Sequence, residues 1–381
     1  MAADATGSPD ADIITIGLMS GTSTDGVDGV LARFDAPGRP QLLAGHTQAM
    51  PASLREEMLA LNQPGHNELE RAALAANQLA DVYADTVNAL LDQAGLTADA
   101  VDAIGAHGQT VRHRPERGYS LQLNAPARLA EKTGIAVIAD FRARDIAAGG
   151  QGAPLVPAFH QAMFAGAEPR AILNLGGIAN LTLLHPGRPV TGFDCGPANM
   201  LMDAWIRRCR ALDFDAGGAW AAGGHCDTTL LERLLDDEPW LAAAPPKSTG
   251  RDLFNLDWLA SRLASRMTQD ATPPADADIQ ATLLAFTVTT ITRALERHAP
   301  DTRRVLACGG GTANPVLMRA LGDALPCPLE TTEAHGLHPQ WVEAAAFAWL
   351  ARAWLREQPA SLPEVTGARA AHRLGCYWPA G

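Results

Sequence analysis

The sequence lacks the features that mark secreted, disulfide-bonded or membrane proteins. Its six cysteines form no C-x-x-C pair, and in a chain of 381 residues such scattered cysteines indicate free thiols rather than a disulfide framework or a zinc site. The first residues, MAADATGSPDADI, have neither the basic nor the apolar segment of a signal peptide. No uninterrupted apolar stretch reaches the roughly 18 residues of a membrane-spanning helix. These absences favour a cytoplasmic protein.

An excess of positive charge is also missing. The chain carries 30 Lys and Arg against 42 Asp and Glu, a formal net charge of -12 at pH 7. This balance argues against binding to nucleic acid or to a membrane surface, but it permits a local basic pocket for a small anionic ligand. A chain of 381 residues exceeds a single ordinary core, so two domains, or one domain with two lobes, are expected.

What the sequence does contain is one plan of elements that occurs twice. Three apolar strands with tight turns are expected over residues 12–50, and three more over residues 170–194. Helices and strands then alternate after each set. The expected helices cover residues 53–62, 68–95, 126–133, 197–210, 256–267, 278–297, 315–324 and 339–357, and residues 147–157 and 216–254 are expected as loop or polar regions. The two copies share almost no sequence, so the duplication indicates two α/β lobes facing each other across a cleft.

Four glycine-rich turns each follow an apolar strand. They lie at Gly21–Gly26, Gly105–Gln109, Gly176–Gly177 and Gly309–Gly311. Glycine lets the backbone approach a ligand closely, and successive backbone N–H groups in such turns bind anions. Any one of these turns can equally be an ordinary hairpin. Four of them at similar places in the plan favour nucleotide binding.

The first turn, GTSTDG, has the G-x-x-x-x-G spacing of a P-loop but not its lysine, because Val27 stands at that position. A strand rather than a helix is expected after it, which favours a hairpin phosphate loop. The hydroxyl groups of the turn can donate to phosphate, and the carboxylates of Asp25 and Asp28 suit Mg²⁺ and its waters. The predicted nucleotide-binding residues here are Gly21, Thr22, Ser23, Thr24, Asp25, Gly26, Val27 and Asp28.

The fourth turn consists of Gly309, Gly310 and Gly311 and connects a strand to a predicted helix. Asn314 is the expected N-cap of that helix, with Pro315 at its first position. Three consecutive glycines exceed what a plain connection needs and would let a flat ligand rest on the backbone.

Asp194, in GFDCGPANM, is the candidate catalytic carboxylate. It is expected to end a strand just before a helix, and a carboxylate on a rigid strand end can act as a general base. The alternative is a helix-entry aspartate that accepts local N–H bonds. Cys195 beside it is expected to pack rather than to react. Glu343 lies in an otherwise apolar helix and is either a site residue or a solvent-facing one, and HGLH at residues 335–338 lacks the further ligands of a metal site.

Taken together, these stretches resemble the anhydro-N-acetylmuramic acid kinases, within the superfamily of actin, hexokinase and heat-shock-chaperone ATPases. The resemblance runs from residue 13 to residue 374 and rests on the following stretches in this order: GLMSGTSTDGVD, HGQTVRH, DFRARDIAAGGQGAPLVPAFH, NLGGIANLT, GFDCGPANMLMDAW, KSTGRDLFN, CGGGTANPVLM and WVEAAAFAWLA. It implies an α/β fold of the two-lobed actin-like ATPase (ribonuclease H-like) kind with a central cleft. The lobes would cover residues 12–165 and 166–381, and the last helices are free to pack back on the first lobe.

The resemblance also implies an activity. The family uses ATP to open 1,6-anhydro-N-acetylmuramic acid with water and to phosphorylate its O6, giving N-acetylmuramic acid 6-phosphate and ADP in peptidoglycan recycling. By matching position, the first turn would bind phosphate, Gly176 and Gly177 would face the phosphates, and Gly309–Gly311 with Asn314 would lie near the adenosine. Asp194 would be the general base. The substrate-binding residues would be Glu343, His107, Gln109 and Gln151.

Other consequences of the resemblance concern cofactors and partners. Mg²⁺ is expected with ATP, but no residue is assigned as its ligand. The expected partner is a small amino sugar, and the sequence leaves open whether the protein is a homodimer. The family often has Thr and Gly where this chain has Cys195 and Ala198, which puts the rate or the pKa of the base in doubt. The alternatives are a kinase of another amino sugar, judged much less favoured, and a chaperone-like ATPase, for which no residual length remains for a substrate domain.

Overall fold

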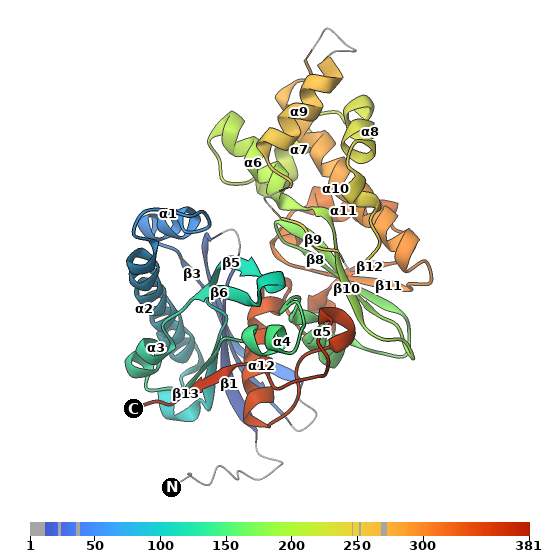
Figure 1. The fold of residues 1–381 in the computed structure, drawn as a ribbon. Helices are drawn as coiled ribbons and strands as arrows, with labels where there is room; N and C mark the ends of the chain where they lie inside the picture. Colours follow the sequence, from blue (N-terminus) through green and yellow to red (C-terminus); the bar gives the residue numbers. More distant parts are fainter. Residues whose placement is uncertain (1–11, 22–23, 36–38, 246, 251–252, 268–272) are drawn as a thin grey trace. The chain divides into compact units, whose positions relative to one another are not determined.

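The computed structural model describes residues 12–21, 24–35, 39–245, 247–250, 253–267 and 273–381 (Figure 1). Thr22 and Ser23, two of the predicted phosphate-binding residues, lie outside the described residues. The chain divides into two compact units: unit 1 runs to Phe164 and includes Trp341–Gly381, and unit 2 is Ala165–Gln340. The predicted lobes at 12–165 and 166–381 stay a prediction, and residues 341–381 pack with the first unit.

Unit 1 contains a six-stranded sheet in the order β13-β7-β4-β1-β2-β3. The three strands of the first predicted meander pair antiparallel, while β4 and β7 run parallel to β1. The bounds are β1 Ile13–Ser20, β2 Gly26–Phe34, β3 Pro40–Ala49, β4 Ala103–Ala106, β7 Val137–Ala139 and β13 Cys376–Trp378. A separate two-stranded ribbon pairs β5 (Gln109–Arg114) with β6 (Tyr119–Leu123).

Two long helices cover opposite faces of this sheet (Figure 1). On one face lies α2 (Glu68–Ala94), and on the other lies α12 (Val342–Leu355). The α12 backbone comes so close that a methyl group added at Gly17 would lie 1.9 Å from the carbonyl oxygen of Ala344, and one at Gly105 would lie 2.1 Å from that of Phe347. Glycine at these two strand positions therefore admits the helix.

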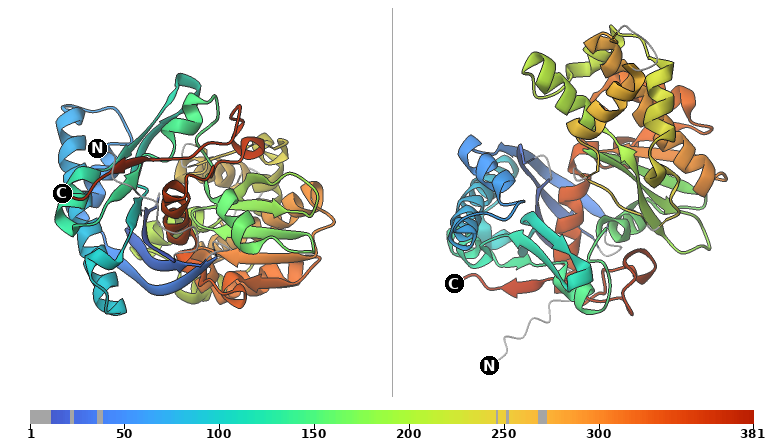
Figure 2. Two further views of the ribbon diagram at one scale, coloured as in Figure 1. Left: turned by 90° about the horizontal axis from the view of Figure 1, so that it is seen from below. Right: turned by 45° about the horizontal axis from the view of Figure 1, so that its top comes forward.

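The C-terminal segment completes unit 1, because β13 pairs antiparallel with β7 at the edge of the sheet (Figure 2). The remaining helices of this unit are short. They are α1 Ala52–Ala60, α3 Pro126–Thr133, α4 Ala143–Ala147, α5 Val156–Phe164 and α13 Pro363–Thr366. Two of them, α3 and α13, begin with a proline in the first turn.

Unit 2 repeats the strand order around a five-stranded sheet, β10-β9-β8-β11-β12. Its strands are β8 Arg170–Leu175, β9 Ile178–Leu184, β10 Thr191–Pro197, β11 Arg304–Cys308 and β12 Leu329–Thr331; its helices are α6 Asn199–Arg210, α7 Ala219–Ala222, α8 Thr228–Asp236, α9 Leu256–Met267, α10 Asp276–His298 and α11 Pro315–Ala324. In both units a three-stranded meander is extended by parallel strands beside its first strand. The predicted α/β fold of the actin-like, ribonuclease H-like kind is thereby confirmed, and the cleft stays a prediction.

One region differs from the expectation. Residues 216–254 are expected as a polar region without a predicted helix, yet they contain α7 and α8. The side chain of Asp227 caps α8 by accepting from the N–H of Leu230, and Leu230 and Leu234 are buried in the core of unit 2. The helix forms because its apolar face is buried there, although it is only nine residues long. In the described part of the chain, no helix combines the length and the apolarity that crossing a bilayer requires.

Candidate active site

The first glycine turn is a hairpin between β1 and β2, as predicted. The N–H of Thr24 donates to the carbonyl oxygen of Gly21 at 3.1 Å, and Thr24 has a positive φ of 54°. Asp25 is exposed. Val27 is fully buried in the core, so its side chain is not available to a ligand. Gly26 is held close to β3, because a methyl group there would lie 2.8 Å from the carbonyl oxygen of Gln48.

Asp28 lies on β2, where Thr47 Oγ1 of the neighbouring strand donates to its Oδ1 at 2.6 Å. Its carboxylate acts on Glu343, in the first turn of α12. Burial raises the pKa of Glu343, the charge of Asp28 raises that pKa further, and Arg142 opposes the rise. Glu343 is therefore a group in a polar cluster of unit 1, which argues against the solvent-facing alternative.

His107 and Gln109 belong to the same part of unit 1. The N–H of His107 donates to Leu18 at 3.0 Å, and its Nε2 lies 2.7 Å from Nη2 of Arg142. Burial, and secondarily the charge of Arg142, lower the pKa of His107 to about 3, so this ring is neutral near pH 7. Gln109 accepts from Ser20 Oγ at 2.5 Å, which ties it to the end of β1.

The turn between His107 and Gln109 is held in place by a hydrogen bond to α2. The N–H of Gly108, which has a φ of 80°, donates to the hydroxyl oxygen of Tyr83 at 3.0 Å. Gly105, in contrast, does not belong to a ligand-facing turn. It lies inside β4, and its lack of a side chain serves the approach of α12. The prediction of a phosphate turn beginning at Gly105 is therefore wrong at that residue.

Gln151 is exposed on the loop between α4 and α5. Its N–H donates to the carbonyl oxygen of Thr366 at 2.8 Å. The next residue, Gly152, is bound through its carbonyl oxygen by Nη1 of Arg142 at 2.7 Å. The structure thus links the loop that carries Gln151 to His107 through the guanidinium group of Arg142.

In unit 2, Asp194 lies within β10 rather than at its end, because the strand continues to Pro197 past a bulge between Asp194 and Gly196. Its Oδ2 accepts from the N–H of Thr249 at 2.9 Å. This partner is 55 residues away, so the alternative of a purely local helix-entry contact does not hold. Burial raises the pKa of Asp194 to about 6, while the Thr249 bond and the charge of Lys247 act in the opposite direction.

Lys247 holds the loop that carries Thr249. Its carbonyl oxygen accepts from the N–H of Asp194 at 3.1 Å, and its Nζ donates to Leu241 at 3.0 Å while lying 4.4 Å from the ring centre of Trp240. Cys195 is buried, and burial followed by the charge of Asp194 raises the pKa of its thiol. An unreactive packed thiol is what the sequence predicts there.

The third and fourth predicted turns come together in unit 2, because β8 and β11 are parallel neighbours. A methyl group at Gly176 or Gly177 would meet nothing nearer than 3.6 Å, so packing within the described chain does not require glycine there. Gly309 has a φ of 86°, and a methyl group on it would lie 2.4 Å from Asn174 Oδ1. One on Gly310 would meet nothing within 4 Å.

Asn314 is confirmed as the N-cap of α11. Its Oδ1 accepts from the N–H groups of Val316 and Leu317 at 3.1 and 3.0 Å. Close by is the turn at Ala216–Gly218, since a methyl group at Gly218 would lie 2.3 Å from the same Oδ1.

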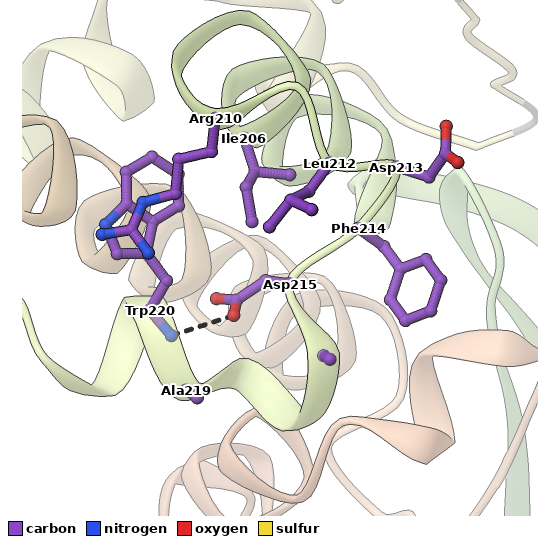
Figure 3. Close-up of a pocket in the computed structure, with 9 residues that line it drawn as sticks. Ile206, Arg210, Leu212, Asp213, Phe214, Asp215, Ala219 and Trp220 are labelled. Carbon is purple, nitrogen blue, oxygen red and sulfur yellow. Dashed lines mark hydrogen bonds between the residues drawn. The ribbon is translucent and has the colours of Figure 1, made fainter.

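This turn also borders a pocket of about 400 Å³ (Figure 3). Asp215 anchors its floor by accepting from the N–H groups of Trp220 and Ala221, both at 2.9 Å, and the Arg210 guanidinium lies 4.5 Å from the ring centre of Trp220. None of the predicted site residues lines the pocket. Within the residues that the structure describes, no group of three or more His, Cys, Asp or Glu side chains could hold a metal ion.

Comparisons with known proteins assign the chain to a family. Residues 13–380 match the family model described as Anhydro-N-acetylmuramic acid kinase. A curated protein of that name from Bordetella pertussis is 61% identical over 365 residues, which cover 96% of each chain. One from Paraburkholderia xenovorans is 53% identical over 377 residues, covering 97% of this chain and 98% of the relative. The solved activator of the 2-hydroxyisocaproyl-CoA dehydratase from Clostridium difficile, with bound ADPNP, aligns at a TM-score of 0.48 and 14% identity over 91% of this chain and 96% of its own. By its sequence, the chain belongs to the anhydro-N-acetylmuramic acid kinase family.

Proposed function

We propose that the protein phosphorylates O6 of 1,6-anhydro-N-acetylmuramic acid with ATP while water opens the anhydro ring, giving N-acetylmuramic acid 6-phosphate and ADP. Family membership supports the substrate pair. The observation that carries the mechanism is Asp194, a partly buried carboxylate that accepts from the N–H of Thr249 and has a pKa raised to about 6. Such a group is ionised at neutral pH but remains basic enough to take a proton.

The reaction uses Asp194 as the general base. The carboxylate takes a proton from water as the water oxygen attacks the anomeric carbon. The bond between that carbon and O6 breaks, O6 takes the γ-phosphoryl group, and the bond to the bridging oxygen of ADP breaks. No separate acid is needed for O6, because the phosphoryl group receives its electron pair. Lys247 and Thr249 hold the carboxylate in place for this step.

The glycine turns bind ATP in this proposal. The hairpin at Gly21–Asp28 offers backbone N–H groups and hydroxyls to the phosphates, and Gly176 with Gly177 offers a backbone that a ligand can approach closely. Gly309–Gly311, next to β8, supports the adenosine. In kinases, one or two carboxylates and the phosphates of the nucleotide together hold Mg²⁺. Asp25 and Asp28 would supply these carboxylates. When bound, Mg²⁺ neutralises charge that develops on the phosphates.

The sugar is bound by the polar cluster of unit 1. His107, neutral at pH 7, and Gln109 offer hydrogen-bonding groups fixed by Arg142 and Ser20, and Gln151 and Glu343 add two more. The proposal places the reaction in the cytoplasm, in the turnover of peptidoglycan sugars.

The test is a product assay with three reaction mixtures. ATP with the anhydro sugar, ATP with reducing N-acetylmuramic acid, and ATP alone are incubated with the protein, and sugar 6-phosphate and ADP are measured by mass spectrometry. The proposal predicts both products in equal amounts from the anhydro sugar, with the oxygen of ¹⁸O-labelled water found on the anomeric carbon. Product from the reducing sugar alone would identify a sugar-hydroxyl kinase instead, and ADP without sugar would identify an ATPase.

A further inference from the structure

Arg142 is the residue that joins the separate parts of the sugar-binding cluster. It stands at the start of α4 and donates from two nitrogens of one guanidinium group. Nη2 lies 2.7 Å from Nε2 of His107, and Nη1 lies 2.7 Å from the carbonyl oxygen of Gly152. The same charge acts on Glu343. A planar guanidinium with two such bonds fixes both partners in one geometry.

The bond to His107 determines which nitrogen of the ring carries the proton. A guanidinium group can only donate, so Nε2 of His107 must accept and the proton must be on Nδ1. The ring also packs against Phe347 of α12 with ring centres 4.7 Å apart, which favours this orientation.

The bond to Gly152 is half of a clamp on one peptide segment. The N–H of Gly152 donates to Oδ2 of Asp145 at 2.7 Å, and Oδ1 of Asp145 accepts from the hydroxyl of Thr366 at 2.8 Å. Both polar backbone groups of Gly152 are therefore bound by side chains at or next to the start of α4: Arg142 binds the carbonyl oxygen and Asp145 binds the N–H. Gly152 has a φ of 66°, and a methyl group there would lie 2.7 Å from Ile146, so the loop has one shape at this point.

We infer that Arg142 is a positioning residue for the sugar: it fixes His107 as the Nδ1–H tautomer and, with Asp145, holds the loop that presents Gln151. The role rests on the proposed function, because it acts on sugar binding, but the tautomer can be observed without turnover. The two bonds have separate geometric requirements. A lysine at this position keeps the charge but cannot donate from two nitrogens set apart in one plane.

The experiment compares Arg142→Met and Arg142→Lys with Arg144→Met, a matched control on the exposed side of the same helix. The KM values for sugar and for ATP are measured, and ¹⁵N-histidine NMR reports the His107 tautomer, with His107→Gln used for assignment. We expect both Arg142 variants to raise the KM for sugar about tenfold or more, as loss of a charge-assisted hydrogen bond does, with the KM for ATP within about twofold. The Nδ1–H signature should be present in the wild type and in Arg144→Met and lost in Arg142→Met.

Three results would overturn the inference: an Nε2–H tautomer of His107 in the wild type, a wild-type KM for sugar in Arg142→Lys, or equal effects on the KM for ATP and for sugar in that folded variant. If Arg142→Met does not fold, Arg142→Lys and the wild-type tautomer still decide. A further outcome is that the wild type makes no product from the anhydro sugar, yet shows the Nδ1–H tautomer and binds the sugar more tightly than Arg142→Lys does. That result would contradict the proposed reaction and support the positioning role.

Discussion

Replacing Asp194 with asparagine should remove activity and at the same time stabilise the fold. The asparagine keeps the shape of the side chain and an oxygen that can accept from Thr249, but it has no charge to bury. A rise of the pKa from 3.8 to about 6 on folding corresponds to about 3 kcal/mol that the ionised carboxylate costs the folded state. For a cooperative unit of 150–250 residues, removal of that cost raises the Tm by on the order of 5–10 °C.

The sign of this effect fixes its pH dependence. A carboxylate with a raised pKa in the folded state is protonated in both states below pH 3.8, so it costs nothing there. The cost grows as the pH rises from 3.8 to about 6 and is complete above that value. Asp194→Asn should therefore unfold well above the wild type at pH 7 and at nearly the same temperature at pH 4. Thermal unfolding at both values, followed by calorimetry, measures the difference.

The same carboxylate sets the pH dependence of turnover. The wild-type kcat/KM should fall about tenfold per pH unit below about pH 6, where Asp194 is protonated, and Asp194→Asn should lose on the order of 10²–10⁴ of the rate at pH 7. A variant that gains no stability at pH 7, or gains the same amount at pH 4, would refute the reasoning about burial. Near-normal turnover by the variant would remove Asp194 as the base.

Four further variants test other parts of the site. Gly310→Ala should leave the Tm unchanged, because a methyl group there meets nothing of the chain within 4 Å, but it should raise the KM for ATP. Gly309→Ala should lower both stability and ATP affinity, because Gly309 has a φ of 86° and the added methyl group would lie 2.4 Å from Asn174 Oδ1. Asn314→Ala should cost about 1 kcal/mol in denaturant unfolding through loss of the α11 cap, and an unchanged midpoint would contradict that role. Glu343→Gln should raise the KM for sugar by less than about tenfold and leave the decrease in rate below about pH 6 unchanged. A shift of that decrease to another pH would indicate that Glu343 is the base.

Much of the fold could be predicted from the sequence because its signals are local. Apolar runs broken by glycine turns predict both meanders, and the N-cap signal of Asn314 with Pro315 fixes the start of α11 to the residue. Helix α8 was missed because it is short and lies in a polar region; burial of Leu230 and Leu234 against the rest of unit 2, together with the Asp227 cap, stabilises it.

The site could be predicted only in part, for the same reason. Asp194 and the glycine turns are recognisable as motifs, but the contact of Asp194 with Thr249 spans 55 residues and has no local signal. Gly105 shows the converse error: a glycine after an apolar run suggests a ligand turn, whereas this one admits α12 from a distant part of the sequence. Arg142 stands in a quoted motif, yet nothing local relates it to both His107 and Gly152.

Each unit contains a partly buried carboxyl group with a raised pKa, Asp194 in unit 2 and Glu343 in unit 1, and the surroundings of the two groups separate their roles. Asp194 has an N–H donor and the cation of Lys247, both of which favour its ionised form and limit the rise of its pKa to about 6. Burial raises the pKa of Glu343, the charge of the Asp28 carboxylate raises it further, and the charge of Arg142 opposes this rise. The first environment suits a base that must be ionised at neutral pH. The second environment makes ionisation of Glu343 less favourable, which suits this carboxyl group less well to the role of the base.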